Sequence, residues 1–188
     1  MNKAIFLDRD GTINVEKHYL YKIEDFEFLP GVIEALKKLQ EAGFLLIIIT
    51  NQSGIGRGLY TEKNFEILNS WMVSYLKNQG ITITSVYYCP HLPDAVIPKY
   101  RKECNCRKPK LGMFFRAIND YNIDIGLSYA IGDKIRDCAI SNSTACKGFL
   151  IGNNEKDEII CKVKKGEMRN IIYAKDLLSC AKQILNTI

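Results

Sequence analysis

Two aspartates separated by a single residue follow the first apolar segment of the chain. Asp8 and Asp10 come directly after residues 4–7, and Gly11 then permits a sharp turn. Residues two apart in an extended chain point to the same side, so both carboxylates converge where a strand would end. Two carboxylates this close repel each other unless a cation lies between them. The motif therefore predicts an acidic site that binds a cation.

Two further aspartates form a second acidic motif. Asp133 follows a glycine, and Asp137 lies four residues further on. Three or four carboxylate oxygens around one point suit Mg²⁺, which keeps several waters and takes few protein ligands. An ionised aspartate can also attack phosphorus and form an aspartyl-phosphate, provided that nearby positive charge offsets the repulsion between anions. Magnesium, Lys108 and the polar groups of residues 50–54 could supply that compensation.

Three cysteines and one histidine form two tight pairs, which are Cys89 with His91 and Cys104 with Cys106. Soft thiolates with one imidazole, and no ligand position left open, describe a structural tetrahedral zinc site. The segment of about residues 89–110, which we call the Cys/His loop, is too polar to fold alone, so zinc would replace a hydrophobic core. Zinc would thereby fix Arg107 and Lys108 over the acidic site.

Two other interpretations of the Cys/His loop are open. Its cysteines could be ordinary buried thiols, although four candidate ligands within eighteen residues of polar loop argue against that. It could also be a nucleic-acid-reading zinc finger, but it lacks the helix with paired histidines that such a finger needs. The remaining cysteines are predicted to be small buried hydrophobic residues: Cys138, Cys146, Cys161 and Cys180.

The elements that must position these residues alternate between apolar strands and amphipathic helices. Strands are predicted over residues 4–7, 45–49, 86–88, 129–131 and 148–151. Helices are predicted over 31–42, from a cap at Thr61 to a stop at Gly80, over 113–121 and over 175–186. This alternation predicts an α/β fold, a Rossmann-like doubly wound parallel sheet with helices on both faces. Ligands bind at the carboxyl ends of such strands, which here carry Asp8, Thr50, Cys89 and Asp133.

Composition limits the class of protein. The 188 residues are 47% hydrophobic and 25% charged, which is typical of one globular domain spanning 1–188. The longest apolar run, residues 44–49, is too short to cross a bilayer, and no secretory segment is evident, so we expect a cytoplasmic protein without a membrane partner. The net charge of +5 is scattered, which favours an anionic small substrate over nucleic acid. No heptad or apolar stripe indicates an oligomer, so a monomer is expected.

The order of these motifs resembles that of the haloacid dehalogenase-like phosphatases. The matching motifs are Asp-x-Asp-Gly-Thr at 8–12, Thr-Asn at 50–51, Lys-Pro at 108–109 and Gly-Asp-x-x-x-Asp at 132–137. The resemblance covers about residues 3–152 and implies a doubly wound parallel sheet with chemistry through an aspartyl-phosphate and Mg²⁺. Thr50 and Lys108 would hold the phosphoryl group that is transferred.

The resemblance also implies a role for each aspartate. Asp8 would be the nucleophile and a magnesium ligand. Asp10 would be the general acid and base, with its main-chain carbonyl on the metal. Asp133 would complete the metal site, and Asp137 would orient Lys108 or the metal-bound waters.

Many members of this family carry a separate cap domain, and this chain has no room for one. The intervals from Asp8 to Thr50 and from Asn51 to Lys108 hold only loops and ordinary elements. Substrate selection must then come from the loops at 14–28 and 52–58 and from the Cys/His loop. These loops are rich in cations, which suggests a second anionic group on the substrate: Lys17, His18, Arg57, Arg107, Lys108 and Lys134.

A narrower resemblance is to the bacterial heptose-bisphosphate phosphatases, whose zinc-bearing chains have similar residues at 8–14, 50–55, 87–91, 106–109 and 132–134. It implies that the 7-phosphate of a sugar bisphosphate is removed and the 1-phosphate is retained. It places a set of side chains on the substrate: Glu16, Lys17, His18, Tyr19, Asn51, Gln52, Ser53, Arg107 and Lys134. One departure is His18, which stands where a glycine is common.

Two rival functions remain open. A histidinol-phosphate phosphatase would share the aspartyl chemistry and a similar zinc loop, but its substrate carries one phosphate and an ammonium group, which does not suit a surplus of cations. A zinc-stabilised binding module without catalysis is the alternative from another class. Under that alternative the acids could have been lost, whereas the full set is present.

Overall fold

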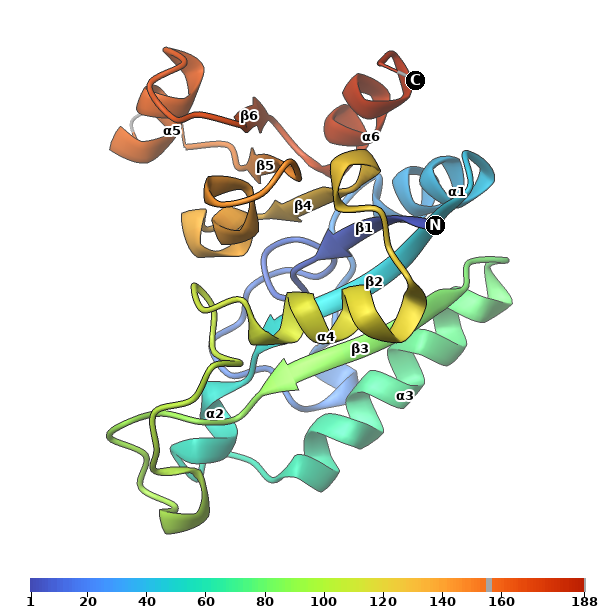
Figure 1. The fold of residues 1–188 in the computed structure, drawn as a ribbon. Coiled ribbons are helices and arrows are strands. Elements are labelled where there is room, and N and C mark those ends of the chain that lie inside the picture. The colour runs from blue at the N-terminus through green and yellow to red at the C-terminus, as the bar shows by residue number, and fades with distance from the viewer. Residues whose placement is uncertain (155–156, 188) are drawn as a thin grey trace.

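The computed structural model describes residues 1–154 and 157–187 and contains one six-stranded, all-parallel sheet (Figure 1). Its strand order is β3-β2-β1-β4-β5-β6, the order typical of doubly wound nucleotide-binding folds. The strands are β1 (Lys3–Leu7), β2 (Phe44–Asn51), β3 (Ile83–Cys89), β4 (Tyr129–Gly132), β5 (Lys147–Ile151) and β6 (Ile171–Ala174). The prediction of a doubly wound α/β fold without a cap domain is confirmed.

Helices cover both faces of this sheet. The α-helices are α1 (Val32–Glu41), α2 (Ser53–Gly56), α3 (Glu62–Asn78), α4 (Gly112–Tyr121), α5 (Glu158–Lys164) and α6 (Leu177–Leu185). Short 3-10 helices lie at Ile23–Asp25, Pro98–Tyr100, Ile125–Leu127 and Ile135–Asn142. Helices α1, α3 and α6 contribute to the core on one face, and α4 with the 3-10 helix at Ile135–Asn142 covers the other (Figure 1).

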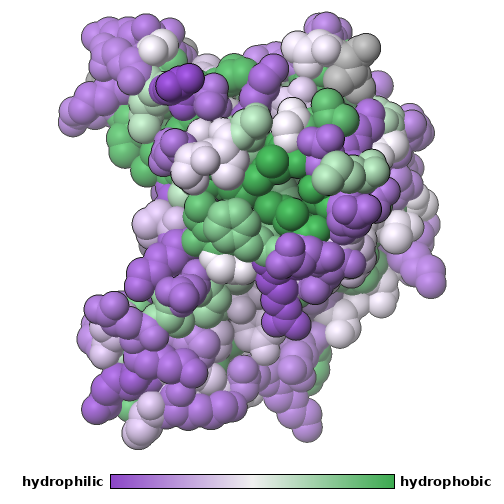
Figure 2. All heavy atoms as spheres, viewed as in Figure 1, coloured by the Kyte–Doolittle hydropathy of each residue, from purple (hydrophilic) through white to green (hydrophobic). Residues whose placement is uncertain are grey.

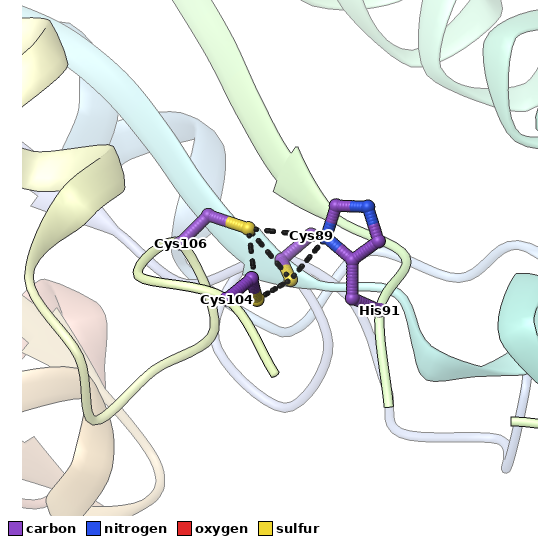
Figure 3. A group of neighbouring side chains, drawn as sticks. All are labelled: Cys89, His91, Cys104 and Cys106. Atoms are coloured by element: carbon purple, nitrogen blue, oxygen red, sulfur yellow. Dashed lines mark hydrogen bonds between the residues drawn. The ribbon is translucent and has the colours of Figure 1, made fainter. Parts of the chain in front are cut away.

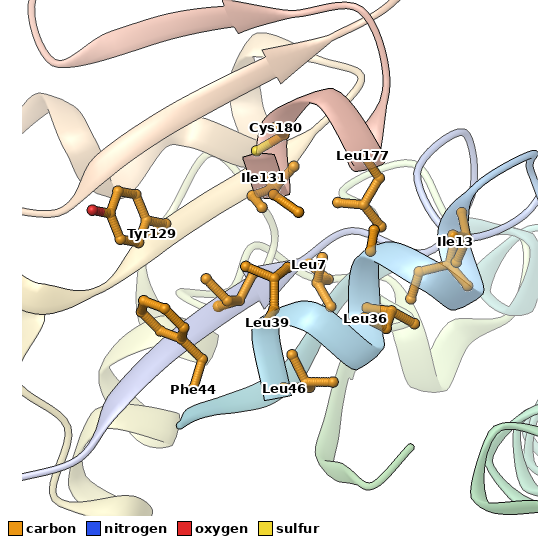
Figure 4. Packing of buried hydrophobic residues seen from close by; sticks show 14 of the residues in the cluster. Leu7, Ile13, Leu36, Leu39, Phe44, Leu46, Tyr129, Ile131, Leu177 and Cys180 are labelled. Atoms are coloured by element: carbon orange, nitrogen blue, oxygen red, sulfur yellow. The ribbon is translucent and has the colours of Figure 1, made fainter. Parts of the chain in front are cut away.

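The central strands are apolar on both sides because both of their faces are buried. In β1, Ile5 and Leu7 point into the larger cluster with α1 and α6, shown in Figure 4, whereas Ala4 and Phe6 point into the cluster under α4. Phe6 meets Phe114 of α4 edge to face, with ring centroids 5.4 Å apart. This two-sided packing fixes where each strand ends, and therefore where its terminal polar residues lie.

The predicted helices are present, and their ends follow local chemistry. Thr61 caps α3: its hydroxyl accepts a hydrogen bond from the Asn64 amide, and the Asn64 side chain accepts one from the Thr61 amide. The helix stops before Gly80, which has a positive φ of 80°. The sixth strand and α5 were not predicted. Both are short, with four and seven residues, so no periodic pattern develops in either.

Two surface features complete the fold. The Cys/His loop leaves β3 and lies beside α2, where the Ile97 amide donates to the Gly56 carbonyl at 3.0 Å. Figure 2 shows hydrophobic side chains gathered between α4 and β4 and hydrophilic ones toward the rim of this face. Among the described residues, no helix is long and apolar enough to span a membrane.

The four cysteines outside the Cys/His loop divide into two groups. Cys138, Cys146 and Cys180 are fully buried, as predicted. Cys161 is only partly buried, so the prediction is wrong there. It lies on α5, a two-turn helix that buries only Ile160 and Val163, and that narrow stripe leaves the neighbouring position half exposed.

Candidate active site

The acidic motifs meet at the carboxyl edge of the sheet because β1 and β4 are parallel neighbours. The Asp8 amide donates to the Ile131 carbonyl at 2.9 Å, which ties the first motif to the end of β4. Gly11 adopts a φ of 80°, and a Cβ built on it would lie 2.6 Å from Cγ of Asp133. Only glycine permits both this backbone conformation and this close approach. The two motifs are therefore held against each other.

Three carboxylates converge here. Oxygens of Asp8, Asp133 and Asp137 lie within 4.8 Å of one another, and Asp8 and Asp137 are buried. Burial raises the pKa of Asp8 to about 6, a shift that Lys108 opposes and Asp137 reinforces. Burial also raises the pKa of Asp133, against the effect of the adjacent Lys134. Hard oxygen donors that repel one another in a buried place suit a small divalent cation, so the donor set fits Mg²⁺.

Lys108 is the positive charge within this cluster. Its side chain is 1% exposed, and its Nζ lies 2.9 Å from Oδ1 of Asp8 and 2.7 Å from Oδ1 of Asp137. The same Nζ donates to the Ile49 carbonyl at 2.6 Å. Burial alone would lower the pKa of Lys108, but the carboxylates of Asp8 and Asp137 raise it. Asp137 thus contacts Lys108, as one of the two roles expected for it requires.

Asp10 is not part of the three-carboxylate cluster. Its oxygens accept hydrogen bonds from Arg9, from Nδ2 of Asn14 at 3.0 Å and from Nε2 of Gln52 at 3.0 Å. Sequence reasoning missed Arg9, although it stands between the two motif aspartates. A charged residue just after a strand is expected to be exposed to solvent, whereas the Arg9 side chain is 1% exposed.

Hydrogen bonds link the residues at the end of β2 to Asp10 and to the backbone of Lys108. Nε2 of Gln52 donates to Oγ1 of Thr50 at 2.9 Å, and Oε1 of Gln52 accepts from the Tyr60 hydroxyl at 2.6 Å. The Asn51 side chain accepts from the Lys108 amide at 3.0 Å and donates to the Lys108 carbonyl at 3.1 Å. The Thr-Asn-Gln segment therefore holds the backbone that carries the lysine as well as facing the site.

A polar cavity of about 210 Å³ opens beside Asp10. Six residues expected on the substrate line it: Glu16, His18, Tyr19, Asn51, Gln52 and Ser53. Its wall also contains Leu20 and Gly54, which lie in the loops 14–28 and 52–58 expected to select the substrate. Sequence reasoning missed Tyr60 and Arg136, which tertiary packing brings to the wall and no motif marks.

The backbone conformation of residues 16–19, which we call the recognition loop, explains why a glycine is common at position 18 in the phosphatases that the chain resembles. His18 and Tyr19 have positive φ values of 44° and 61°. Glycine adopts this region without cost, whereas other residues are strained there. The loop therefore keeps the turn that a glycine would favour and adds an imidazole to the wall of the cavity.

Three expected substrate contacts lie elsewhere in this conformation. Lys17 pairs with Glu27, with 3.1 Å between Nζ and Oε2, and Lys134 pairs with Asp133 at 2.8 Å. Arg107 lines a separate cavity of about 340 Å³ on the Cys/His loop and donates to the His91 carbonyl at 3.4 Å. The structure thus does not bring these three cations into the 210 Å³ cavity.

The four residues of the Cys/His cluster face one another (Figure 3). The sulfurs of Cys89, Cys104 and Cys106 lie 3.1 to 3.5 Å apart, and Nδ1 of His91 lies 3.3 Å from Cys106 and 3.7 Å from Cys89. Zinc–sulfur bonds of about 2.3 Å in a tetrahedron place sulfurs about 3.8 Å apart. The sulfurs lie closer together than this value, but no disulfide forms among the described cysteines, and the soft donor set fits zinc.

Comparison with known proteins, both by sequence and by structure, also indicates a phosphatase. The family model described as polynucleotide kinase 3 phosphatase matches residues 3–141. The D-glycero-beta-D-manno-heptose-1,7-bisphosphate 7-phosphatase of Haemophilus ducreyi is 47% identical over 77% of this chain and 80% of its own. The alpha-named counterpart of Photorhabdus laumondii is 49% identical over 72% of this chain and 74% of its own.

Solved structures agree. The D,D-heptose 1,7-bisphosphate phosphatase of B. bronchiseptica, complexed with magnesium and phosphate, is 29% identical, has a TM-score of 0.82 and covers both chains completely. A putative HAD-like phosphatase from Mesorhizobium loti is 26% identical, with a TM-score of 0.81 over 99% of this chain and 87% of its own. The chain therefore belongs to the polynucleotide kinase 3 phosphatase family and is a haloacid dehalogenase-like phosphatase of the D-glycero-D-manno-heptose-1,7-bisphosphate 7-phosphatase group.

Proposed function

We propose that this protein removes the 7-phosphate of D-glycero-D-manno-heptose 1,7-bisphosphate through an aspartyl-phosphate on Asp8, in the biosynthesis of nucleotide-activated heptose. The observation that carries the proposal is the buried lysine, Lys108, at 2.9 Å from the carboxylate at the end of β1. A cation in this place offsets the repulsion between the attacking carboxylate and the phosphate. The heptose-bisphosphate relatives support the choice of substrate.

In the first step, an oxygen of Asp8 attacks phosphorus while the bond from phosphorus to the sugar oxygen breaks. Asp10 gives its proton to that sugar oxygen, which leaves as an alcohol. Lys108 and the Thr50 hydroxyl bind the phosphoryl oxygens. Their charges and dipoles are fixed before the reaction, so they need no reorganisation when negative charge develops.

In the second step, a water molecule attacks the phosphorus of the aspartyl-phosphate and Asp10 takes up its proton. The acyl-phosphate bond breaks, inorganic phosphate leaves and the Asp8 carboxylate is restored. Mg²⁺ bound by Asp8, Asp133 and the main-chain carbonyl of Asp10 would supply further positive charge at the phosphoryl group. The cluster of three carboxylates at the edge of the sheet supports this ligand set.

Substrate recognition is proposed for the recognition loop and the end of β2. The contacting residues would be Glu16, Lys17, His18, Tyr19, Asn51, Gln52, Ser53, Arg107 and Lys134, and the cavity lined by most of them supports this set. Lys17 and Lys134 would have to exchange their present carboxylate partners for substrate.

The Cys/His cluster is proposed to bind a structural Zn²⁺ through Cys89, His91, Cys104 and Cys106. Its donor types and spacing support this assignment. We further propose that residues 1–188 act as one domain and as a cytoplasmic monomer without nucleic-acid or membrane partners. The mild and scattered net charge of +5 supports the absence of a nucleic-acid partner.

A substrate panel tests the function. Phosphate release with Mg²⁺ is measured on heptose 1,7-bisphosphate, histidinol phosphate and a 3′-phosphorylated oligonucleotide, and phosphorus NMR identifies the phosphate that remains. The expected result is the fastest turnover on the heptose bisphosphate, with the 1-phosphate retained, and no turnover by Asp8→Asn. Faster turnover of histidinol phosphate or of the oligonucleotide would overturn the substrate. Full activity of Asp8→Asn would overturn the mechanism.

A further inference from the structure

Arg9 is a buried arginine that contacts a single acid. Its side chain is 1% exposed, and both oxygens of Asp10 lie 2.9 Å from Nη2 and 3.2 Å from Nε. Nη2 also donates to the Leu20 carbonyl at 3.3 Å, and the guanidinium lies over the Phe65 ring, 5.5 Å from its centroid. The plane of the guanidinium is therefore fixed from two directions while it faces Asp10.

Packing alone does not account for this residue. The remaining nitrogen of Arg9, Nη1, is buried without a hydrogen-bond partner among residues 1–154 and 157–187. Burying an unsatisfied charged donor is costly, and an apolar side chain of similar volume usually fills such a space at least as well. The arginine therefore has a use that its contribution to the core does not explain.

The contacts on Asp10 show what that use is. Asp10 is 17% exposed and also accepts hydrogen bonds from Asn14 and Gln52. Gln52 is fixed in turn by the Tyr60 hydroxyl. Arg9 is the charged member of this set and the one that contacts both oxygens, so it contributes the strongest interaction that holds the carboxylate in place. A general acid must keep one oxygen within hydrogen-bond reach of the leaving oxygen.

We propose that Arg9 is the positioning residue for Asp10 and sets the orientation in which that carboxyl protonates the leaving sugar oxygen. This inference rests on the proposed function, because it requires Asp10 to act as the general acid. Arg9 itself is buried and does not touch the substrate. Its removal should therefore reduce proton delivery to the leaving group and leave substrate binding largely intact.

The experiment compares two substrates that differ in their need for that proton. An alkoxide leaving from the sugar needs a proton, whereas p-nitrophenolate leaves without one. The ratio kcat/KM reports the first irreversible step, which is formation of the aspartyl-phosphate, whatever the rate of its later hydrolysis. The quantity compared is kcat/KM on heptose bisphosphate and on p-nitrophenyl phosphate for wild type, Arg9→Met, Arg9→Lys and Asp10→Asn.

General acid–base catalysis raises reaction rates roughly 10²- to 10⁴-fold. The kcat/KM of Arg9→Met should therefore fall at least about tenfold on heptose bisphosphate and less than about threefold on p-nitrophenyl phosphate. Equal losses on the two substrates would mean a structural role and would overturn the inference. Arg9→Lys keeps the buried charge but offers one nitrogen in place of the two that contact Asp10 and lacks the fixed plane of the guanidinium, so the same selective loss is expected if Arg9→Met does not fold. An Arg9→Lys protein with wild-type ratios would also overturn it.

The Asp10→Asn protein separates this inference from the function it rests on. A selective loss in Asp10→Asn together with none in the Arg9 variants would refute only the role of Arg9. The absence of a selective loss in Asp10→Asn would refute the acid role of Asp10 itself, and the inference would fall with it.

Discussion

Replacing Lys108 with methionine should destabilise the magnesium-free protein and abolish most of its activity. Methionine keeps much of the volume of the lysine but removes the charge that lies 2.9 Å from Asp8 and 2.7 Å from Asp137. Removing one partner of a buried ion pair costs about 3–5 kcal/mol because the other charge remains buried and unpaired. Loss of a preorganised donor to a developing charge should lower kcat by about 10²- to 10³-fold.

The destabilisation should depend on pH in a defined direction. The pKa of Asp8 is raised to about 6 in the folded protein. Between the ordinary pKa of an aspartate and pH 6, the folded state therefore binds more protons than the unfolded state. Stability from this group is therefore present at low pH and is lost as pH rises toward 6. Without Lys108 the folded pKa rises further, so this loss extends to higher pH.

Urea unfolding in magnesium-free buffer at pH 5 and pH 8 measures both effects. The difference in unfolding free energy between wild type and Lys108→Met should be larger at pH 8, and added Mg²⁺ should recover part of it. Lys147→Met is the control: Lys147 is exposed, and its replacement should change stability by less than about 0.5 kcal/mol. A Lys108→Met protein as stable as wild type at both pH values would refute the assignment of this lysine as the counter-charge of the acids.

Three further outcomes are expected from other parts of the site. Cys104→Ser should lose bound zinc, make the Cys/His loop sensitive to protease and lower kcat about tenfold or more, since the loop carries Lys108; a zinc-free protein with full activity would contradict the coupling. Gly11→Ala should raise the Mg²⁺ concentration needed for half-maximal activity about tenfold, because its methyl group meets a metal-site carboxyl, whereas Gly80→Ala has the same φ and no neighbour within 4 Å and should not. Asn51→Ala should lower kcat about tenfold and stability by about 1–3 kcal/mol, because two hydrogen bonds to the Lys108 backbone are lost; an unchanged kcat and stability with a raised KM would instead indicate a substrate contact alone.

The carboxyl edge could be predicted from sequence because parallel topology leaves few alternatives. Once residues 4–7 and 129–131 are strands of one parallel sheet, Asp8 and Asp133 must lie at the same edge. The same reasoning brings Thr50 to that edge. Periodicity and end signals were also sufficient for the long α3, which has a cap at one end and a glycine at the other.

What could not be predicted depends on contacts between distant segments. Tyr60 reaches the site because α2 and the turn after it return the chain to Gln52. Arg9 lies in a motif, but the burial of a charge depends on what surrounds it, and the Phe65 ring that covers it is 56 residues away in the chain.

The cations near the site differ in whether they already form ion pairs, and this difference indicates which of them can bind a second phosphate. No acid forms an ion pair with Arg57, Arg107 or Arg136 among residues 1–154 and 157–187, whereas the lysines beside the site have carboxylate partners. Burial lowers the pKa of Arg107, and the proximity of Arg136 and Arg57 adds to that effect, so these guanidinium groups repel one another. A phosphate would relieve the repulsion and pair with an arginine through two parallel hydrogen bonds. The ammonium group of histidinol phosphate would increase it. We therefore expect the arginines, rather than the lysines, to make this site favour a bisphosphate over an aminated monophosphate.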